Sequence, residues 1–218
     1  MTSGSDNIRV LITSLFLTIS IFALGLVAAH GLDFIRLNVL DDNFNNHVMN
    51  SDFLILEKEF LNTFDTDFCF DINNKLINLS TDMRDIGREM TSFGALTLFK
   101  KDEFDLLKRN FFLLELNYYS QILELNEKCD GGYLPIIFFF KADDQISERQ
   151  GFIIQELMET HKQVVAINLD IDFKDEYLIN YLIDYYNITQ APSLILNETI
   201  KLEGLQYQND LLQLIVSQ

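Results

Sequence analysis

Cysteine is the residue type in this sequence with the most specific chemistry. The 218-residue chain has two cysteines, Cys69 and Cys129. Two thiols can form a structural disulfide, or they can act as a redox pair that exchanges with other disulfides. The three histidines, His30, His47 and His161, are scattered, and none has a partner at the spacing of a zinc site. The cysteines are therefore the first candidates for chemistry.

A cluster of carboxylates follows one of the predicted strands. Its members are Asp170, Asp172, Asp175 and Glu176. Calcium takes several carboxylate oxygens, but this spacing matches no calcium-loop motif. We interpret the cluster as a solvated strand end, and we predict neither a metal site nor a cofactor.

Two long segments carry apolar residues at the heptad spacing of packed helices. The first seam consists of Cys69, Ile72, Leu76, Leu79, Met83, Ile86, Met90 and Phe93. The second consists of Phe104, Leu107, Phe111, Leu114, Tyr118, Ile122, Leu125 and Cys129. Residues 94–101 interrupt the pattern, so the two seams predict an antiparallel helical hairpin. A shorter helix is predicted at 51–61.

The predicted hairpin brings the two cysteines to the same end. Cys69 begins the first arm and Cys129 ends the second, and both occupy seam positions, so a disulfide is geometrically reasonable. On the chain-entropy model such a bridge stabilises the fold by about 4 kcal/mol. The alternative is a pair of buried free thiols, which pack like small hydrophobic side chains. A bridge also requires an oxidising compartment, which agrees with export of this region.

The N-terminal segment has the length and composition of a membrane span. Val10 to Ala29 contains no charged residue, and about twenty apolar residues suffice to cross a bilayer as a helix. The alternative is a cleaved signal peptide, because Val27-Ala-Ala29 has the small residues of a cleavage site. The apolar run is longer than a usual signal core and follows a single basic residue, Arg9, which favours an uncleaved anchor in membrane lipid. Either interpretation sends the remainder of the chain across the membrane.

From Pro135 onward the apolar residues alternate between strand and helix periods. We predict strands at 135–140, 164–169, 193–196 and 199–202, with a turn at 197–198. We predict helices from Ser147 to about His161, from Asp175 to Asn187, and from Asn209 to Val216. Ser147 to Gln150 has the pattern of a capping box for the first of these helices. The order is β-α-β-α-β-β-α.

This order, with Pro192 opening the third strand and Gly204 following the fourth, resembles the thioredoxin fold. The resemblance covers about the last two-fifths of the chain. It implies a cis peptide bond at Pro192. It also implies that Ala191, the residue before it, offers backbone groups to an extended peptide, whereas in the alternative the proline only shapes the turn.

The resemblance departs from the family at the active site. The family's Cys-x-x-Cys motif aligns with Asp144 and Ser147, and neither residue can form a disulfide. We interpret these two degenerate active-site positions as residues that cap and start a helix. With its apolar N-terminal segment, the chain looks like single-pass, membrane-anchored thioredoxin-like proteins of prokaryotes, some of which keep the dithiol and some of which do not.

The charge balance limits the classes of partner. A net charge of −17 argues against nucleic acid and against anionic membrane surfaces, because both require a positive surface. Basic partners remain compatible with this charge.

These observations predict an α/β chain in three parts. They are a membrane anchor with a short leader at 1–30, a helical stalk and hairpin at 31–130, and a thioredoxin-like domain at 131–218. The leading hypothesis is a membrane-anchored extracytoplasmic protein without a redox dithiol, which binds a peptide or protein partner or acts as a scaffold and is not an enzyme. One alternative is a thiol-disulfide oxidoreductase that uses Cys69 and Cys129. Another is a subunit of a membrane complex whose hairpin seam binds another chain.

Overall fold

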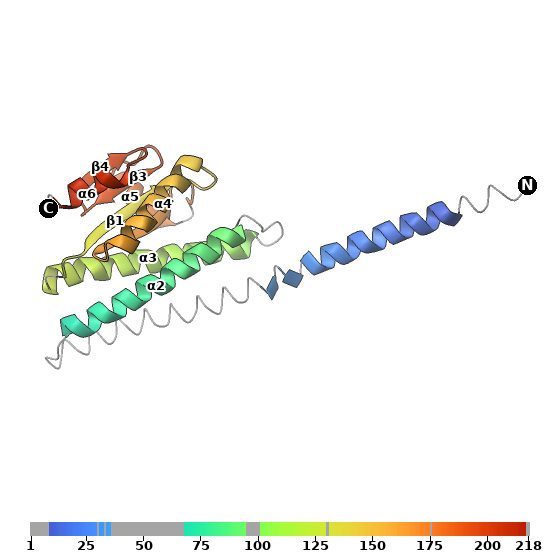
Figure 1. Cartoon of the computed structure of the whole chain (residues 1–218), viewed down its shortest axis with the longest axis horizontal. Helices are drawn as coiled ribbons and strands as arrows, with labels where there is room; N and C mark the ends of the chain where they lie inside the picture. The colour runs from blue at the N-terminus through green and yellow to red at the C-terminus, as the bar shows by residue number, and fades with distance from the viewer. Residues whose placement is uncertain are drawn as a thin grey trace, which may run out of the picture.

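A computed structural model of the chain describes residues 9–29, 31–32, 34–35, 68–94, 101–129, 131–174 and 176–216. Figure 1 shows a helical hairpin packed beneath a sheet and its covering helices. The helix predicted at 51–61 lies outside the described residues.

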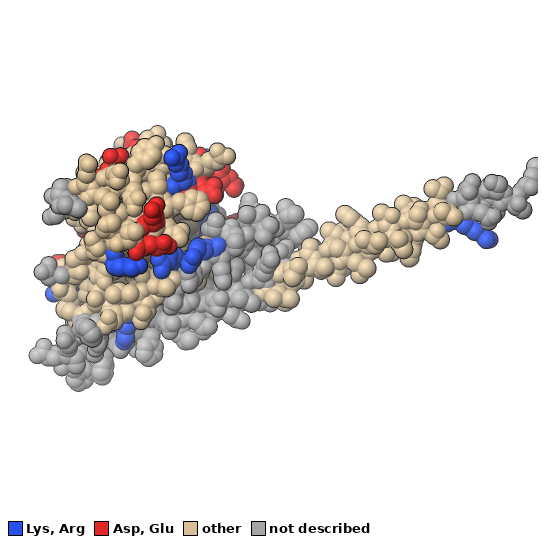
Figure 2. Space-filling view, in the orientation of Figure 1, with Lys and Arg blue, Asp and Glu red and all other residues tan. Residues whose placement is uncertain are grey.

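The N-terminal helix spans Arg9–Ala29. Among the described residues it is the one helix that is long and apolar enough to cross a membrane, and none of its apolar window is buried. Residues 10–29 contain no charged residue, and the visible face of this helix is uncharged in Figure 2. Apolar side chains on every side of a helix of this length are typical of a membrane span.

The two seams form the predicted antiparallel hairpin of α2 (Phe68–Gly94) and α3 (Lys101–Cys129). The buried seam residues are Ile72, Leu76, Leu79, Met83, Ile86 and Met90 in α2, and Leu107, Phe111, Leu114, Tyr118, Ile122 and Leu125 in α3. A disulfide between Cys69 and Cys129, with the two Cα atoms 5.6 Å apart, closes one end of the hairpin. The predicted bridge is therefore confirmed.

Four strands form one mixed sheet in the order β2-β1-β3-β4. They are β1 (Leu134–Phe140), β2 (Val164–Asp170), β3 (Ser193–Leu196) and β4 (Ile200–Glu203). β1 pairs parallel with β2 and antiparallel with β3, and β3 pairs antiparallel with β4. Residues 197–199 connect the paired residues Leu196 and Ile200, with positive φ angles at Asn197 and Glu198. The backbone N–H of Thr199 donates to the carbonyl oxygen of Leu196 (3.2 Å), which closes the turn.

The two faces of the sheet are covered by different helices. Even-numbered residues of β1, such as Ile136 and Phe138, pack with α4 (Gln145–Thr160) and α6 (Gln208–Val216). Odd-numbered residues, such as Ile137 and Phe139, pack with the hairpin and with α5 (Tyr177–Tyr185). Side chains alternate between faces along a strand, so β1 is apolar throughout because both of its faces are buried.

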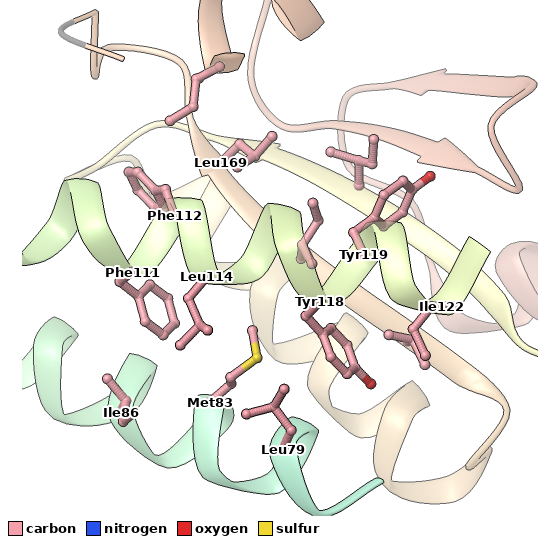
Figure 3. Packing of buried hydrophobic residues seen from close by; sticks show 14 of the residues in the cluster. Leu79, Met83, Ile86, Phe111, Phe112, Leu114, Tyr118, Tyr119, Ile122 and Leu169 are labelled. Carbon is pink, nitrogen blue, oxygen red and sulfur yellow. The ribbon is translucent and has the colours of Figure 1, made fainter. Parts of the chain in front are cut away.

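Helix α3 packs against α2 and against the sheet at the same time. In Figure 3, Phe111, Leu114 and Tyr118 point toward α2, whereas Phe112 and Tyr119 point toward the sheet. Phe112 and Tyr119 are both buried, in the same apolar cluster as Leu169 of β2. Gly131 and Gly132 separate α3 from β1 along the chain, but a single apolar core continues across this point. The second arm of the hairpin thus also forms a layer over the sheet.

Candidate functional site

The carboxyl end of β1 brings together the four residues predicted from the resemblance, which are Asp144, Ser147, Ala191 and Pro192. The turn after β1 leads through Asp144 into α4. Ser193 pairs with Phe139 in the register of β1 and β3, which places Pro192 beside the last residue of β1. The backbone N–H of Gly204 donates to the carbonyl oxygen of Pro192 (2.8 Å), so the segment after β4 lies against the same edge.

Asp144 is the N-cap of α4. Its carboxylate accepts a hydrogen bond from the backbone N–H of Ser147 (2.8 Å). The hydrogen bonds from Ser147, first from its backbone and then from its side chain, hold the pKa of the Asp144 carboxyl below its usual value. A carboxylate also interacts favourably with the positive end of the helix dipole. The capping box predicted at Ser147 to Gln150 is therefore wrong, because the helix begins two residues earlier, at Gln145.

Ser147 lies in the first turn of α4 and is only 2% exposed. Its hydroxyl oxygen accepts a hydrogen bond from the backbone N–H of Lys141 (3.2 Å), which ties the turn after β1 to the helix. A hydroxyl and a carboxylate at these two positions can hold a turn and exchange hydrogen bonds. They cannot carry out thiol-disulfide exchange, which needs a thiolate.

Ala191 and Pro192 lie directly before β3, on the side of the site opposite the start of α4. The peptide bond between them is cis, and Pro192 is buried whereas Ala191 is half-buried. The hydroxyl of Ser193 donates to the carbonyl oxygen of Gln190 (2.7 Å), which fixes the chain around this bond. In the part of the chain that the structure describes, the backbone N–H and C=O of Ala191 make no hydrogen bond. This leaves both groups available to an extended segment.

Gln150 has a tertiary role in place of the capping role predicted from the sequence. Its side chain is fully buried, and its Oε1 accepts a hydrogen bond from the backbone N–H of Gln206 (2.6 Å). Its Nε2 is buried without a partner among the described residues. Gln150 thus joins α4 to the segment between β4 and α6.

Comparisons with known proteins give matches among solved structures alone. No family model matches the chain, and no curated protein matches it. The chain is similar to a structure described as that of a malarial protein (21% identity, 39% of this chain, 96% of that chain, TM-score 0.34). It is also similar to oxidized thioredoxin O2 from Arabidopsis thaliana (19% identity, 47% of this chain, 87% of that chain, TM-score 0.34). A third similar structure is oxidised thioredoxin from Plasmodium falciparum (21% identity, 47% of this chain, 89% of that chain, TM-score 0.33). Values this low indicate nothing about activity.

The topology is more informative than these alignments. The sheet order β2-β1-β3-β4, the parallel pairing of β1 with β2 and the cis bond entering β3 agree with the resemblance found in the sequence. The fold is mixed α/β, with one four-stranded sheet. Asp144 and Ser147, the two positions that the sequence resemblance aligns with a redox motif, lie at the start of α4, directly after β1.

The disulfide lies away from this site. Cys129 precedes β1 and Asp144 follows it, so the seven residues of β1, about 20 Å of strand, separate the two positions. Asn126 holds the intervening connection, because its side chain donates to the carbonyl oxygen of Tyr133 (2.7 Å) and accepts from the N–H of Tyr133 (2.9 Å). The hydroxyl of Tyr133 in turn donates to Asn73 of α2. The connection is therefore fixed to both arms of the hairpin.

Ion pairs fasten α3 to the carboxyl end of β2 and the start of α5. Lys108 pairs with Asp170 (2.6 Å), and Arg109 pairs with Glu176, the N-cap of α5 (2.6 Å). Lys141 also pairs with Asp172 (3.0 Å). Carboxylates of the cluster that the sequence presented as a solvated strand end are thus matched by three cations. The prediction of solvated side chains is wrong for Asp170 and Glu176, which are 4% and 6% exposed, because each is buried and paired with a cation of α3.

Glu115 is a buried carboxyl group between α3 and β2. Its Oε1 accepts hydrogen bonds from the backbone N–H (3.3 Å) and the side-chain amide (2.9 Å) of Asn168, whereas its Oε2 is buried without a partner among the described residues. Burial raises the pKa of Glu115 to about 8, against the hydrogen bonds from Asn168, which lower it. Spacing on α3 was the available signal, because Lys108, Phe112, Glu115 and Tyr119 repeat at intervals of 4, 3 and 4 and mark a second buried face.

Proposed function

We propose that this protein is a membrane-anchored, extracytoplasmic thioredoxin-like protein that binds an extended peptide segment of a partner and does not catalyse disulfide exchange. The N-terminal helix is the anchor, the disulfide-closed hairpin is the stalk, and the edge at Ala191 and Pro192 receives the peptide.

The state of the redox positions is the observation that carries this proposal. The Asp144 carboxylate is occupied by the backbone of Ser147, and the Ser147 hydroxyl is occupied by the backbone of Lys141. Across the same edge, the backbone of Ala191 keeps its hydrogen-bonding groups open within the described residues. A strand added here gains main-chain hydrogen bonds without any chemistry at the turn.

The disulfide and the apolar helix support the location. Disulfides persist in oxidising compartments, and Cys69 and Cys129 are bridged. An N-terminal apolar helix of 21 residues provides the means of export and anchoring. Export and anchoring together lead to a folded part outside the cytoplasm.

The absence of redox catalysis is tested with the full chain in detergent, a small disulfide substrate and dithiothreitol as reductant. We expect the rate of substrate reduction to equal that of a Cys69→Ala/Cys129→Ala variant, which contains no cysteine. Turnover that is faster in the natural protein than in this variant contradicts the proposal.

Peptide binding is tested by placing a photo-reactive phenylalanine analogue at Ile146, which is exposed in the first turn of α4. The matched control is the same analogue at Phe152, which is exposed on the same helix farther from the turn. We expect polypeptide crosslinks in native membranes from position 146 and not from position 152. Equal crosslinking at both positions contradicts a peptide site at this edge.

A second candidate function is thiol-disulfide exchange through the bridge itself. It is favoured by the partial exposure of both Cys69 and Cys129, which lets a thiol approach the bridge. A redox titration separates the two functions, because structural disulfides have reduction potentials below about −300 mV and catalytic ones have higher potentials. We expect the low value, and a potential near that of a redox enzyme supports exchange instead.

A further inference from the structure

Helix α5 presents a row of three exposed tyrosines. Tyr177, Tyr181 and Tyr185 follow one another at intervals of four residues, so they lie along one face of the helix. Their exposed fractions are 75%, 51% and 67%. Large side chains on the buried face of α5, such as Ile179, are fully covered, which identifies the tyrosine row as the outer face. We call Tyr177, Tyr181 and Tyr185 the tyrosine row.

The rings of the tyrosine row are ordered by contact with one another and with the core. The ring centroids of Tyr177 and Tyr181 are 6.5 Å apart, and those of Tyr181 and Tyr185 are 6.0 Å apart in a stacked arrangement. Tyr185 meets Tyr186 edge-on at 4.8 Å, and Tyr186 meets Phe139 of β1 at 6.5 Å. Side chains held in this way lose little conformational entropy when a partner binds, which is a property of aromatic contact residues.

The tyrosine row lies in a part of the chain that is acidic overall. The segment 176–187 contains no lysine or arginine, and Asp184 is exposed between Tyr181 and Tyr185. Burial raises the pKa of the Tyr186 hydroxyl, and the nearby carboxylate of Glu198 raises it further. Residues 131–218 as a whole carry thirteen acidic and five basic residues.

Three cations border α5. Lys174 precedes the helix, Arg109 pairs with its N-cap Glu176 (2.6 Å), and the ammonium of Lys201 donates to the carbonyl oxygen of Asn187 beyond its C-terminus (2.6 Å).

Cations already lie against aromatic rings elsewhere in this chain. The guanidinium carbon of Arg149 lies 5.8 Å from the ring centroid of Tyr207, and the ammonium of Lys108 lies 5.6 Å from that of Phe112. These are the distances of cation–π contacts, in which the negative face of a ring attracts a positive charge. The three rings of the tyrosine row offer the same kind of face, and no cation–π contact involves them within the described residues.

We propose that the tyrosine row is a docking surface for an arginine-bearing, net basic peptide segment of a partner protein. Arginine stacks on tyrosine faces, and the exposed carboxylate of Asp184 favours its charge. An anionic membrane surface is disfavoured by the net charge of −17. The surface consists of residues other than those of the Ala191 edge, so it is a second interaction site and does not depend on the function proposed above.

The test measures binding of a fluorescent peptide of alternating arginine and glycine to the full chain in maltoside detergent, by fluorescence anisotropy at low salt. In one variant Leu replaces all three tyrosines (Y177L/Y181L/Y185L), which keeps apolar bulk and removes the rings. In the other, Phe replaces them (Y177F/Y181F/Y185F), which keeps the rings. The control variant is Tyr207→Leu, which removes an exposed tyrosine elsewhere. A peptide of alternating glutamate and glycine is the control ligand.

We expect the arginine peptide to bind the natural protein. Affinity should fall at least tenfold in the Leu variant, since each exposed cation–π contact contributes about two- to fivefold, and change less than threefold in the Phe variant and in Tyr207→Leu. The proposal is overturned if the natural protein does not bind the arginine peptide, if it binds the glutamate peptide equally, or if the Leu variant binds as the natural protein does. It is also overturned if the Phe variant or Tyr207→Leu loses affinity as strongly as the Leu variant. Displacement of the peptide by an equal concentration of free phosphocholine overturns it in favour of a lipid headgroup, whose quaternary ammonium also binds aromatic faces.

Discussion

Glu115 of α3 accepts two hydrogen bonds from Asn168, one from the backbone and one from the side chain, and so joins the hairpin to the outer strand of the sheet. Asn168 lies on β2, which is at the edge of the four-stranded sheet. The carboxyl group therefore occupies a place beside β2 that a further strand would otherwise take. It satisfies one edge N–H and helps to block edge-to-edge association.

Glu115→Gln should change how stability depends on pH. Below about pH 4.5 both the folded and the unfolded chain hold the Glu115 proton, so no difference arises. As the pH rises toward 8, the unfolded chain releases this proton before the folded chain does, and the free energy of unfolding falls by on the order of 4 kcal/mol. The Gln side chain does not titrate, so the variant gains stability relative to the natural protein as the pH rises through this window.

Denaturant unfolding of both proteins at pH 5 and pH 8 checks this prediction. Glu127→Gln is the matched control, because Glu127 is an exposed carboxylate on the same helix. A difference between Glu115→Gln and the natural protein that is the same at both pH values contradicts the assignment of a buried neutral carboxyl.

Lys108→Met should destabilise the junction between the hairpin and the sheet. The substitution keeps the apolar stem and removes the ammonium, which leaves Asp170 buried without its ion-pair partner. Breaking a buried pair in this way costs roughly 3–5 kcal/mol. Lys128→Met breaks an exposed pair with Glu124 on the same helix and should cost far less stability, because solvent screens the two charges. Chemical denaturation measures both, and equal small losses refute a structural role for the Lys108 pair.

Removal of the disulfide should lower stability without removing the fold. The bridge closes a loop with a sequence separation of 60 residues, and the loss on the chain-entropy model is about 4 kcal/mol, within a usual range of 2–5 kcal/mol. We expect Cys69→Ala/Cys129→Ala to unfold at lower denaturant concentration than the oxidised natural protein, with helical circular dichroism retained in buffer. If the two proteins unfold at the same concentration, the bridge does not stabilise the hairpin.

Asp144→Cys/Ser147→Cys should create redox activity in the Cys69→Ala/Cys129→Ala background. Position 144 is partly exposed at a helix N-terminus, which lowers a thiol pKa, and position 147 is buried beside it, which suits a resolving thiol. The new pair would reduce a substrate disulfide and become oxidised, and dithiothreitol would reduce it again. The measurement is the rate of substrate reduction, with Asp144→Cys alone as the control, which has no resolving thiol. If the pair forms and the rate stays at that of the control, the geometry of this turn differs from that of a redox thioredoxin.

Elements whose apolar residues recur at a single regular spacing could be predicted from the sequence. α2 buries one stripe against α3, so its apolar residues from Ile72 to Met90 form a single seam. The position of Cys69 on that seam made it possible to predict the bridge with Cys129. β1 is apolar at every position because both faces are covered, and its bounds differ from the prediction by one residue.

The buried second face of α3 was missed because its polar members resemble surface residues. Lys108 and Glu115 are charged. When one apolar seam is taken as the buried face of a helix, charged residues outside that seam are expected to face solvent. The paired aromatics at Phe111 and Phe112, and at Tyr118 and Tyr119, were the available sign that two sides of this helix are covered.

The prediction of a capping box at the start of α4 was wrong for a related reason. The pattern describes neighbours along the chain, whereas the hydroxyl of Ser147 serves the turn that leaves β1, and Gln150 serves the segment before α6. Local rules for helix termini do not include such tertiary partners.

The double packing of α3 has a consequence for how the chain can be divided. A fragment that starts at Gly131 contains all four strands of the described sheet, yet it would expose Val165, Ile167 and Leu169 to water, because the helix that shields them has been removed. Such a truncation should aggregate and is not a minimal soluble unit. During synthesis α3 leaves the ribosome before the strands, so the helix that covers the sheet is present before the sheet forms.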